Sequence, residues 1–367
     1  MQAPREGVGR GDELPNRPTV SVVICAYTED RWLQLKKSVA SVEAQTSPPI
    51  EIIVCIDHNE ELLGKSEEYF GKGRPAAAMP LIVLANKYNG RLGSARNTAA
   101  EFASGEVLAF LDDDAAAAAD WLERLIAPYD DERVGAVGGA PLPVFEVKRP
   151  RWFPHEFDWV FGCTYRGLPL TRAPLAHLIG ANMSARRSAL REVGGFHSDD
   201  HDDMDMCHRI AYAQYRVLYE PLAIAYHFVP AIRTTWHYFW RRCYLVNQGK
   251  VEAFANMHEA SSLGAELTFV ARTLTTGVLA EIRHVIRGDL YGLARVGAMI
   301  AGIALAGLGH LSGKLRLRWS RRVPAVGRHV SVHVQRIARR AGISVRRPTS
   351  RRRWRVGPRD GRPGHVR

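Results

Sequence analysis

Residues 107–114 read VLAFLDDD, an apolar run that ends in three consecutive aspartates. Two earlier segments have the same form: TVSVVIC at 19–25 leads into a polar turn, and EIIVCI at 51–56 is followed by Asp57. Short apolar runs of this kind, rich in β-branched residues and bounded by polar turns, predict buried strands. Residues 81–84 predict a further strand of the same type.

Amphipathic helices are expected between these strands. Apolar residues recur at three- and four-residue steps at Trp32, Leu35, Val39 and Val42, which is typical of a helix that covers a sheet. Residues 94–103 predict a second helix. Strands that alternate with helices form a parallel sheet in an α/β domain. Because ligands of such sheets bind beyond the carboxyl ends of the strands, the site is expected there.

The composition indicates a folded body and a basic tail. The chain has 367 residues, of which 46% are hydrophobic and 24% charged, and this excludes global disorder. Its five cysteines are scattered without a C-x-x-C pair, so neither a disulfide framework nor a zinc knuckle is predicted. Residues 314–367 carry a formal charge of +17, which leaves −5 for the rest. Such a tail is expected to be solvated and to favour anionic membranes, since no groove-reading motif predicts specific nucleic-acid binding.

The three aspartates at the end of the 107–111 run predict a metal site. Adjacent carboxylates repel one another, and a divalent cation removes the conflict. Mg²⁺ and Mn²⁺ prefer oxygen ligands and complete their shell with water and substrate phosphates, which suits a nucleotide diphosphate. The alternative is a solvated acidic turn before the helix that contains Trp121 and Leu122.

The order and spacing of the polar segments resemble the family 2 inverting glycosyltransferases. The resemblance is carried by Val20–Glu29, Glu51–Asp57, Gly93–Asn97, Phe110–Asp114, Gly180–Met183, Gly194–Phe196 and Asp202–Arg209. It implies a single Rossmann-like nucleotide-sugar-binding domain with a mostly parallel central sheet. It also implies transfer from a UDP- or GDP-sugar with Mg²⁺ or Mn²⁺ as cofactor.

The resemblance assigns donor-side roles to the strand ends. Asp57 would pair with the nucleobase and Tyr27 would stack against it, although a core aromatic suits Tyr27 equally. Arg96 would face the diphosphate at a helix N-terminus; its alternative is a surface arginine paired with Glu101. The remaining donor-side positions are Ala26, Glu29 and Asp113.

Metal and base positions follow from the same resemblance. Asp114 would be the direct metal ligand, and Asp112 would contact the ribose or support the metal. Inverting transfer needs a base that takes the proton of the attacking hydroxyl. Asp203 matches the family's base, and Asp202 stands where glutamate is usual. The alternative use of these acids is to cap a helix.

Acceptor-side positions lie further along the chain. They are Asn182, Gly195, Phe196, Trp236, Arg241 and Arg242. Residues 236–250 predict an aromatic and basic helix, which could instead pack on the sheet. The Gln-x-x-Arg-Trp signature of processive synthases is missing, so single-sugar transfer is expected. His227 follows a strand-like run at 216–226 and could approach the metal or be a structural histidine.

Four segments are predicted. Residues 1–18 form a disordered leader, 19–255 the catalytic domain, 256–313 a helical, membrane-proximal region and 314–367 a disordered basic tail. Uncharged residues span only about fourteen positions within the third segment, fewer than the ~20 that cross a bilayer. An interfacial or re-entrant hairpin on the cytoplasmic membrane face is therefore expected, with a hairpin packed on the catalytic domain as the alternative. Either a saccharide or a polyprenyl-linked acceptor would suit this arrangement.

Two other classes of function stay open. A nucleotidyltransferase also combines a parallel sheet with metal-binding acids, but its glycine-rich, lysine-bearing loop is missing after the first strand, where Tyr27-Thr28-Glu29 stands. A non-enzymatic membrane- or nucleic-acid-binding protein would use the basic tail and keep the acidic body as a scaffold.

Overall fold

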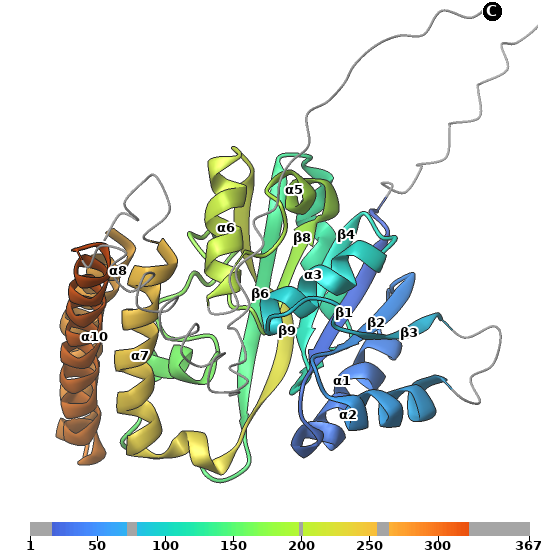
Figure 1. Cartoon of the computed structure of the whole chain (residues 1–367). Coiled ribbons are helices and arrows are strands. Elements are labelled where there is room, and N and C mark those ends of the chain that lie inside the picture. The colour runs from blue at the N-terminus through green and yellow to red at the C-terminus, as the bar shows by residue number, and fades with distance from the viewer. Residues whose placement is uncertain (1–16, 72–78, 198–200, 255–263, 323–367) are drawn as a thin grey trace, which may run out of the picture. The chain divides into compact units, whose positions relative to one another are not determined.

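The computed structural model describes residues 17–71, 79–197, 201–254 and 264–322 (Figure 1). Residues 1–317 form the compact unit that carries the site. Most of the predicted leader at 1–18 and of the predicted basic tail at 314–367 lies outside the described residues, so both stay predictions.

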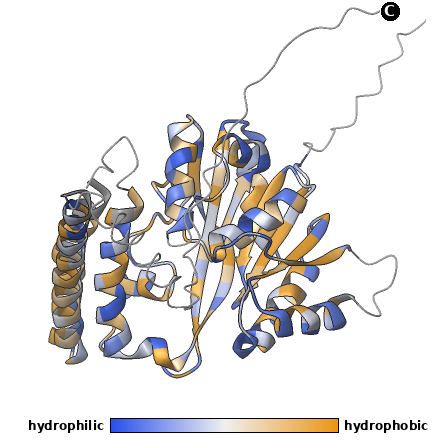
Figure 2. Ribbon diagram, viewed as in Figure 1, coloured by the Kyte–Doolittle hydropathy of each residue, from blue (hydrophilic) through white to orange (hydrophobic). Residues whose placement is uncertain are grey.

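The first half of the sheet is parallel and has its strands where the sequence predicts them. In the order β3-β2-β1-β4 these strands are Leu81–Ala85, Glu51–Ile56, Val20–Ala26 and Val107–Asp112. Every residue of β2 is buried, as expected for a central strand covered on both faces (Figure 2). Helix α1 (Trp32–Glu43) covers one face through Leu35, Val39 and Val42, and α3 (Leu92–Phe102) belongs to the core on the other. The predicted α/β fold is confirmed.

The second half of the sheet is mixed. It continues from β4 in the order β8-β6-β9-β5, with β7 paired to β9. These strands are Asn182–Arg186, Val134–Phe145, Arg216–Val229, Ala115–Ala117 and Ala173–Pro174. Strand β8 runs antiparallel to β4 and β6, whereas β6 and β9 are parallel. The parallel pattern predicted from the sequence is therefore interrupted at β8, which none of the strand signals anticipated.

Helices cover the sheet and lead to the site. The shorter ones are α2 (Glu60–Ser66), α4 (Trp121–Ile126), α5 (Arg187–Glu192) and α6 (Asp202–Tyr212). Helix α4 contains the predicted Trp121 and Leu122, both buried. Helix α6 begins at Asp202, so its first turn presents the second acidic cluster.

The C-terminal helices pack on the catalytic part through an aromatic core. They are α7 (Trp236–Phe254), α8 (Gly264–Arg272), α9 (Val278–Ile286) and α10 (Tyr291–Arg322). Phe157 of the short helix η4 (His155–Phe161), Phe239 of α7 and Met299 of α10 are fully buried in one cluster. The helices thus follow the alternative of a bundle packed on the catalytic domain, and α7 lies beside α10 (Figure 1).

Helix α10 is one continuous helix and runs past residue 313, where the basic tail was predicted to start. Within the described residues, Tyr291–Trp319 is the one helix long and apolar enough to cross a membrane, and 28% of its most apolar window is buried. The helix includes charged residues on both sides of the apolar run. Counting only the uncharged residues therefore underestimates the length of the helix.

Glycines bring α10 against the backbone of α7. A Cβ on Gly309 would lie 2.1 Å from the carbonyl oxygen of Tyr244, whereas a Cβ on Gly307 would meet nothing within 4 Å. We expect Gly309→Ala to lower the free energy of unfolding by about 1–3 kcal/mol, because the helices must separate. Gly307→Ala is the matched control and should be neutral or slightly stabilising. Thermal unfolding followed by circular dichroism measures both, and equal melting temperatures would contradict this packing.

Candidate active site

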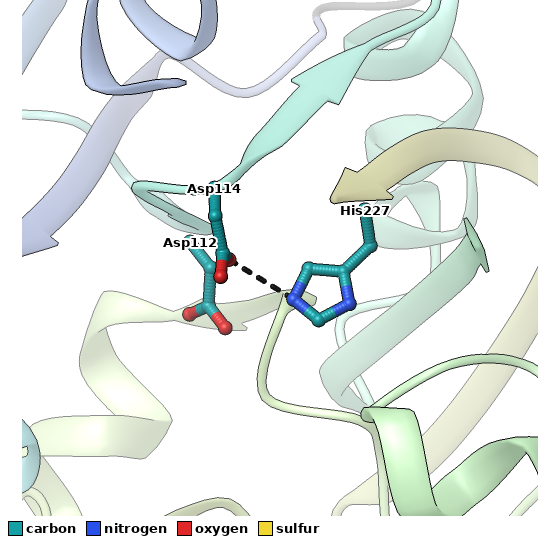
Figure 3. A group of neighbouring side chains, drawn as sticks. All are labelled: Asp112, Asp114 and His227. Atoms are coloured by element: carbon teal, nitrogen blue, oxygen red, sulfur yellow. Dashed lines mark ion pairs between the residues drawn. The ribbon is translucent and has the colours of Figure 1, made fainter. Parts of the chain in front are cut away.

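The acidic strand end of β4 meets a histidine from β9. Strand β5 pairs antiparallel with β9, which sets Ala115 opposite His227. The Nε2 atom of His227 lies 3.0 Å from Oδ1 of Asp114 (Figure 3). One ligand atom from each of Asp112, Asp114 and His227 lies within 4.8 Å of the others. Of the two uses considered for His227, the structure favours the one beside the acids.

Two arginines that the sequence analysis missed relieve the repulsion between the acids. Arg31 Nη1 lies 2.9 Å from Asp113 Oδ1 and 3.1 Å from Asp114 Oδ2. Arg233 Nη2 lies 3.7 Å from Asp114 Oδ2. Burial raises the pKa of Asp113 to about 7 against the opposing charge of Arg31. Asp113 was predicted on the donor side. It forms an ion pair with Arg31 and does not belong to the group of Asp112, Asp114 and His227.

The Asp112, Asp114 and His227 group has the chemistry of a divalent-cation site. Asp114 and His227 are almost fully buried, and Asp114 Oδ1 has no aligned hydrogen bond within the described residues despite its contact with His227. Two carboxylates and an imidazole are ligands that Mn²⁺ accepts, and the carboxylates suit Mg²⁺. A buried oxygen without a hydrogen-bond partner is costly unless a cation or proton satisfies it.

The charges of this group are coupled. Burial alone would lower the pKa of His227, but the contacts with Asp114 and Cys163 outweigh it and raise the pKa to about 10. Burial would likewise raise the pKa of Asp114, but His227, Arg31 and Arg233 lower it to about 2. At neutral pH the metal-free protein therefore holds an imidazolium beside a carboxylate, and a cation would replace the imidazolium proton.

Arg96 joins the two acidic clusters. It is 2% exposed, its Nη1 lies 2.6 Å from Asp202 Oδ2, and its Nη2 lies 3.3 Å from Asp112 Oδ1. Burial raises the pKa of Asp202 to about 6 even though Arg96 opposes the shift. The alternative of a surface arginine paired with Glu101 is wrong, because Glu101 pairs with Lys87 instead. Two carboxylates far apart in the sequence thus share one buried guanidinium.

Asp203 lies beside this link and is half-buried. Its Oδ2 accepts a hydrogen bond of 2.9 Å from Gly180 N, and its Oδ1 accepts one of 2.8 Å from Met204 N. A Cβ on Gly180 would lie 3.1 Å from Asp203 Oδ2 and 3.3 Å from Arg96 Nη1. The two backbone N–H donors fix the position of the Asp203 carboxylate, and that position requires a glycine at 180.

The ends of β1 and β2 carry the predicted nucleotide-binding residues. Tyr27 is 56% exposed and the guanidinium of Arg31 lies 5.4 Å from its ring centroid, so the alternative of a core aromatic is wrong. Asp57 accepts a hydrogen bond of 2.8 Å from Asn86 Nδ2, and its N–H donates to the carbonyl of Ala26. Asn86, which the sequence analysis did not single out, therefore fixes the carboxylate. Glu29 lies in the first turn of the short helix η1 (Glu29–Arg31).

A cavity of about 970 Å³ joins the two acidic clusters. Asp112, Arg96, Asp202 and Asp203 all line it, together with residues of α7, α8 and α10. The hypothesis drawn from the sequence requires the metal side and the base side to face one cleft. The cavity reaches the metal side at Asp112, whereas Asp114 and His227 are almost fully buried and are not among its lining residues.

The predicted acceptor-side residues divide into two sets. Arg242 lines the cavity, whereas Arg241 and Trp236 do not. Asn182 is fully buried and uses its amide to bind Trp121 and Ala223, so it supports the sheet. Its predicted acceptor contact does not fit this position, because both ends of its amide are already hydrogen-bonded.

Gly195 and Phe196 shape the wall behind Arg96. Phe196 is buried, with its ring centroid 5.3 Å from that of Phe110, and the Arg96 guanidinium lies 5.7 Å from the Phe196 ring. Gly195 has a φ of +76°, which favours glycine. Phe196 therefore packs on Arg96, Gly195 leaves room for the Asn97 side chain, and neither residue lines the cavity.

The chain is similar to known glycosyltransferases. Residues 21–194 match the family model for glycosyl transferase family 2. A glucosyl-dolichyl phosphate glucuronosyltransferase of Haloferax volcanii is 35% identical over 178 residues, which are 48% of this chain and 55% of that protein. A pre-mycofactocin glycosyltransferase of Mycobacterium tuberculosis is 27% identical over 178 residues, 48% of this chain and 37% of that protein. The chain thus spans about half the length, or less, of these curated relatives.

A solved structure has the same fold. It is a mannosyltransferase from Pyrobaculum calidifontis in complex with GDP-Man and Mn²⁺, with a TM-score of 0.55. The alignment covers 82% of this chain and 90% of the mannosyltransferase at 21% sequence identity. The resemblance extends well beyond residue 194 and includes the second half of the sheet.

Proposed function

We propose that the chain moves one sugar from a nucleotide diphosphate sugar to a hydroxyl acceptor with inversion, because residues 21–194 match the family model for glycosyl transferase family 2. One observation carries the proposal: Asp112 and Asp203, from distant parts of the chain, face one cavity. Arg96 contacts both Asp112 and the carbonyl of Gly180, whose N–H donates to Asp203. A base and an anion-binding group on opposite sides of a sugar are what a single displacement requires.

Each acid has a separate task in this reaction. The acceptor oxygen forms a bond to the anomeric carbon as the bond to the diphosphate breaks, and Asp203 takes the hydroxyl proton. Asp112, Asp114 and His227 would hold Mg²⁺ or Mn²⁺, which stabilises the charge of the departing diphosphate. Arg96 keeps Asp112 and Asp202 at a fixed separation. Tyr27 and Asp57 would bind the base of a UDP- or GDP-sugar at the adjacent strand ends.

The acceptor is proposed to be lipid-linked and the protein to act at a membrane. The relative with 35% identity is named for a glucosyl-dolichyl phosphate substrate. Large apolar residues are exposed on α9, on α10 and in the turn between them, namely Ile282, Ile286, Leu290, Leu293, Ile300, Leu308 and Leu311. Arg283, Arg287, Lys314 and Arg316 flank them. An apolar face bordered by cations suits the anionic cytoplasmic surface of a membrane.

A product assay separates this function from the runner-up. With a nucleotide sugar, Mn²⁺ and a lipid-linked or soluble saccharide, a glycosyltransferase releases the nucleoside diphosphate. A nucleotidyltransferase would instead release pyrophosphate from a nucleoside triphosphate and a sugar phosphate. Screening UDP- and GDP-sugars with Mg²⁺ and Mn²⁺ tests the proposal, and pyrophosphate release would overturn it.

Metal binding should release a proton. His227 is protonated at neutral pH because its pKa is raised to about 10, and a metal ligand must be the neutral imidazole. We therefore expect about one proton released per Mn²⁺ near neutral pH, and an affinity that rises about tenfold per pH unit below the pKa of His227. Titration calorimetry in two buffers of different ionisation enthalpy measures the release. His227→Gln should abolish it, and a parent protein without proton release would exclude His227 as a ligand.

A further inference from the structure

The cavity that holds the reacting carboxylates is also lined by three C-terminal helices. Leu245 of α7, Phe269 of α8 and Ile303 of α10 belong to its lining, as does Phe157 of η4. Figure 1 shows α7, α8 and α10 on the side of α6 that faces away from β4, which bears Asp112. The cavity therefore has an acidic part at the strand ends and an apolar part at the helices.

Two guanidinium groups line the helical part without a carboxylate partner. Throughout residues 17–71, 79–197, 201–254 and 264–322, Arg242 and Arg272 form no ion pair, and Arg272 donates to the carbonyl of Gly167. Arg166, which also lines the cavity, differs because it pairs with Glu156 at 3.0 Å. Unpaired guanidinium groups are well suited to binding phosphate oxygens.

We propose that Arg242 and Arg272 bind the phosphate of the acceptor and that the apolar wall binds the first part of its hydrocarbon chain. This inference rests on the proposed function, since it uses the same cavity and leaves the acceptor hydroxyl at Asp203. The ligand class is an anionic amphiphile: a phosphate diester with a hydrocarbon on one side and a sugar on the other.

The apolar wall favours a lipid phosphate over free phosphate. Ile303 and Ala306 line the cavity from α10, and Ile300 and Leu308 are exposed on the same helix. Helix α10 thus presents apolar side chains both to the cavity and to the outer surface, and a hydrocarbon chain could pack on either set. Inorganic phosphate would gain nothing from these contacts.

Binding of a short prenyl phosphate tests the inference. Geranyl phosphate, geraniol and inorganic phosphate are each titrated into the full-length protein by calorimetry. We expect geranyl phosphate to bind at least about tenfold more tightly than either fragment. Arg242→Gln and Arg272→Gln should each weaken geranyl phosphate binding by about tenfold or more, because a charge-assisted hydrogen bond is lost. Arg191→Gln changes an exposed arginine of α5 outside the cavity and should match the parent.

A second variant separates the two halves of the site. Ile303→Asn should weaken geranyl phosphate binding and leave inorganic phosphate binding unchanged. Equal binding by Arg242→Gln and Arg191→Gln would overturn the inference, and so would equal affinity for geranyl phosphate and inorganic phosphate.

Binding of UDP or GDP with Mn²⁺ is measured in the same proteins. If the parent binds the nucleotide but not geranyl phosphate, the inferred acceptor site is wrong and the proposed function still stands. If the parent binds geranyl phosphate through Arg242 but no nucleotide, the proposed function fails and this anion site stands.

Discussion

Replacing Asp114 with asparagine is expected to slow sugar transfer by about 10²- to 10³-fold. Asp114 contributes a buried carboxylate beside His227 and Asp112, and an amide keeps its shape but removes the negative charge. Losing one anionic ligand should remove about 3–4 kcal/mol of transition-state stabilisation. Initial rates at several Mn²⁺ concentrations measure the effect, and the apparent Mn²⁺ affinity should fall with the rate.

Asp113→Asn is the matched comparison for this substitution. Asp113 is the adjacent buried aspartate, pairs with Arg31 and has a pKa raised to about 7 by burial. Its charge is thus already partly lost at neutral pH, so neutralising it should change Mn²⁺ affinity less than Asp114→Asn does. Full activity in Asp114→Asn, or equal losses in the two variants, would contradict the metal assignment.

The second large effect is expected at Asp203. Asp203→Asn should lower the transfer rate by about 10²- to 10⁴-fold, because an amide cannot accept the proton of the attacking hydroxyl. Binding of the nucleoside diphosphate with Mn²⁺ should stay close to that of the parent, since Asp203 lies on the side of Gly180 and Met204. Single-turnover rates and calorimetric binding constants distinguish the two steps.

Asp203→Asn could also lower the transfer rate by destabilising the start of α6, and a control variant tests this explanation. Asparagine keeps only one acceptor oxygen for the two N–H groups that Asp203 binds, which should cost about 1 kcal/mol of stability. Asp205→Asn disturbs the same helical turn, but Asp205 pairs with Arg209 and does not line the cavity. Comparable rate losses in the two variants would show that the helix, and not the base, is affected.

The sequence predicts the first half of the fold because its signals are local. Apolar runs at β1, β2, β3 and β4 identify strands, and the polar residues that follow identify the binding edge. Asp112, Asp114 and Asp203 stand out because carboxylates at strand ends and helix starts indicate metal ligands or a general base without any knowledge of tertiary contacts. Residues 21–194 match the family model for glycosyl transferase family 2, in agreement with the resemblance that these motifs carry.

The residues that the sequence analysis missed depend on tertiary contacts. Arg31 and Arg233 become partners of the acids only when η1 and the segment after β9 are folded against β4. His227 reaches Asp114 through the pairing of β5 with β9, and β5 consists of three alanines that give no pattern. The sequence singles out Arg96 but leaves its role open. A buried arginine between two carboxylates cannot be distinguished in sequence from a surface arginine.

The close contact at Gly309 has a geometric consequence. Because α10 touches the backbone of α7 there, the two helices cannot move closer together at Gly309. Arg242 of α7 and Ile303 of α10 both line the cavity, so this contact fixes how far apart these two parts of the cavity wall stand.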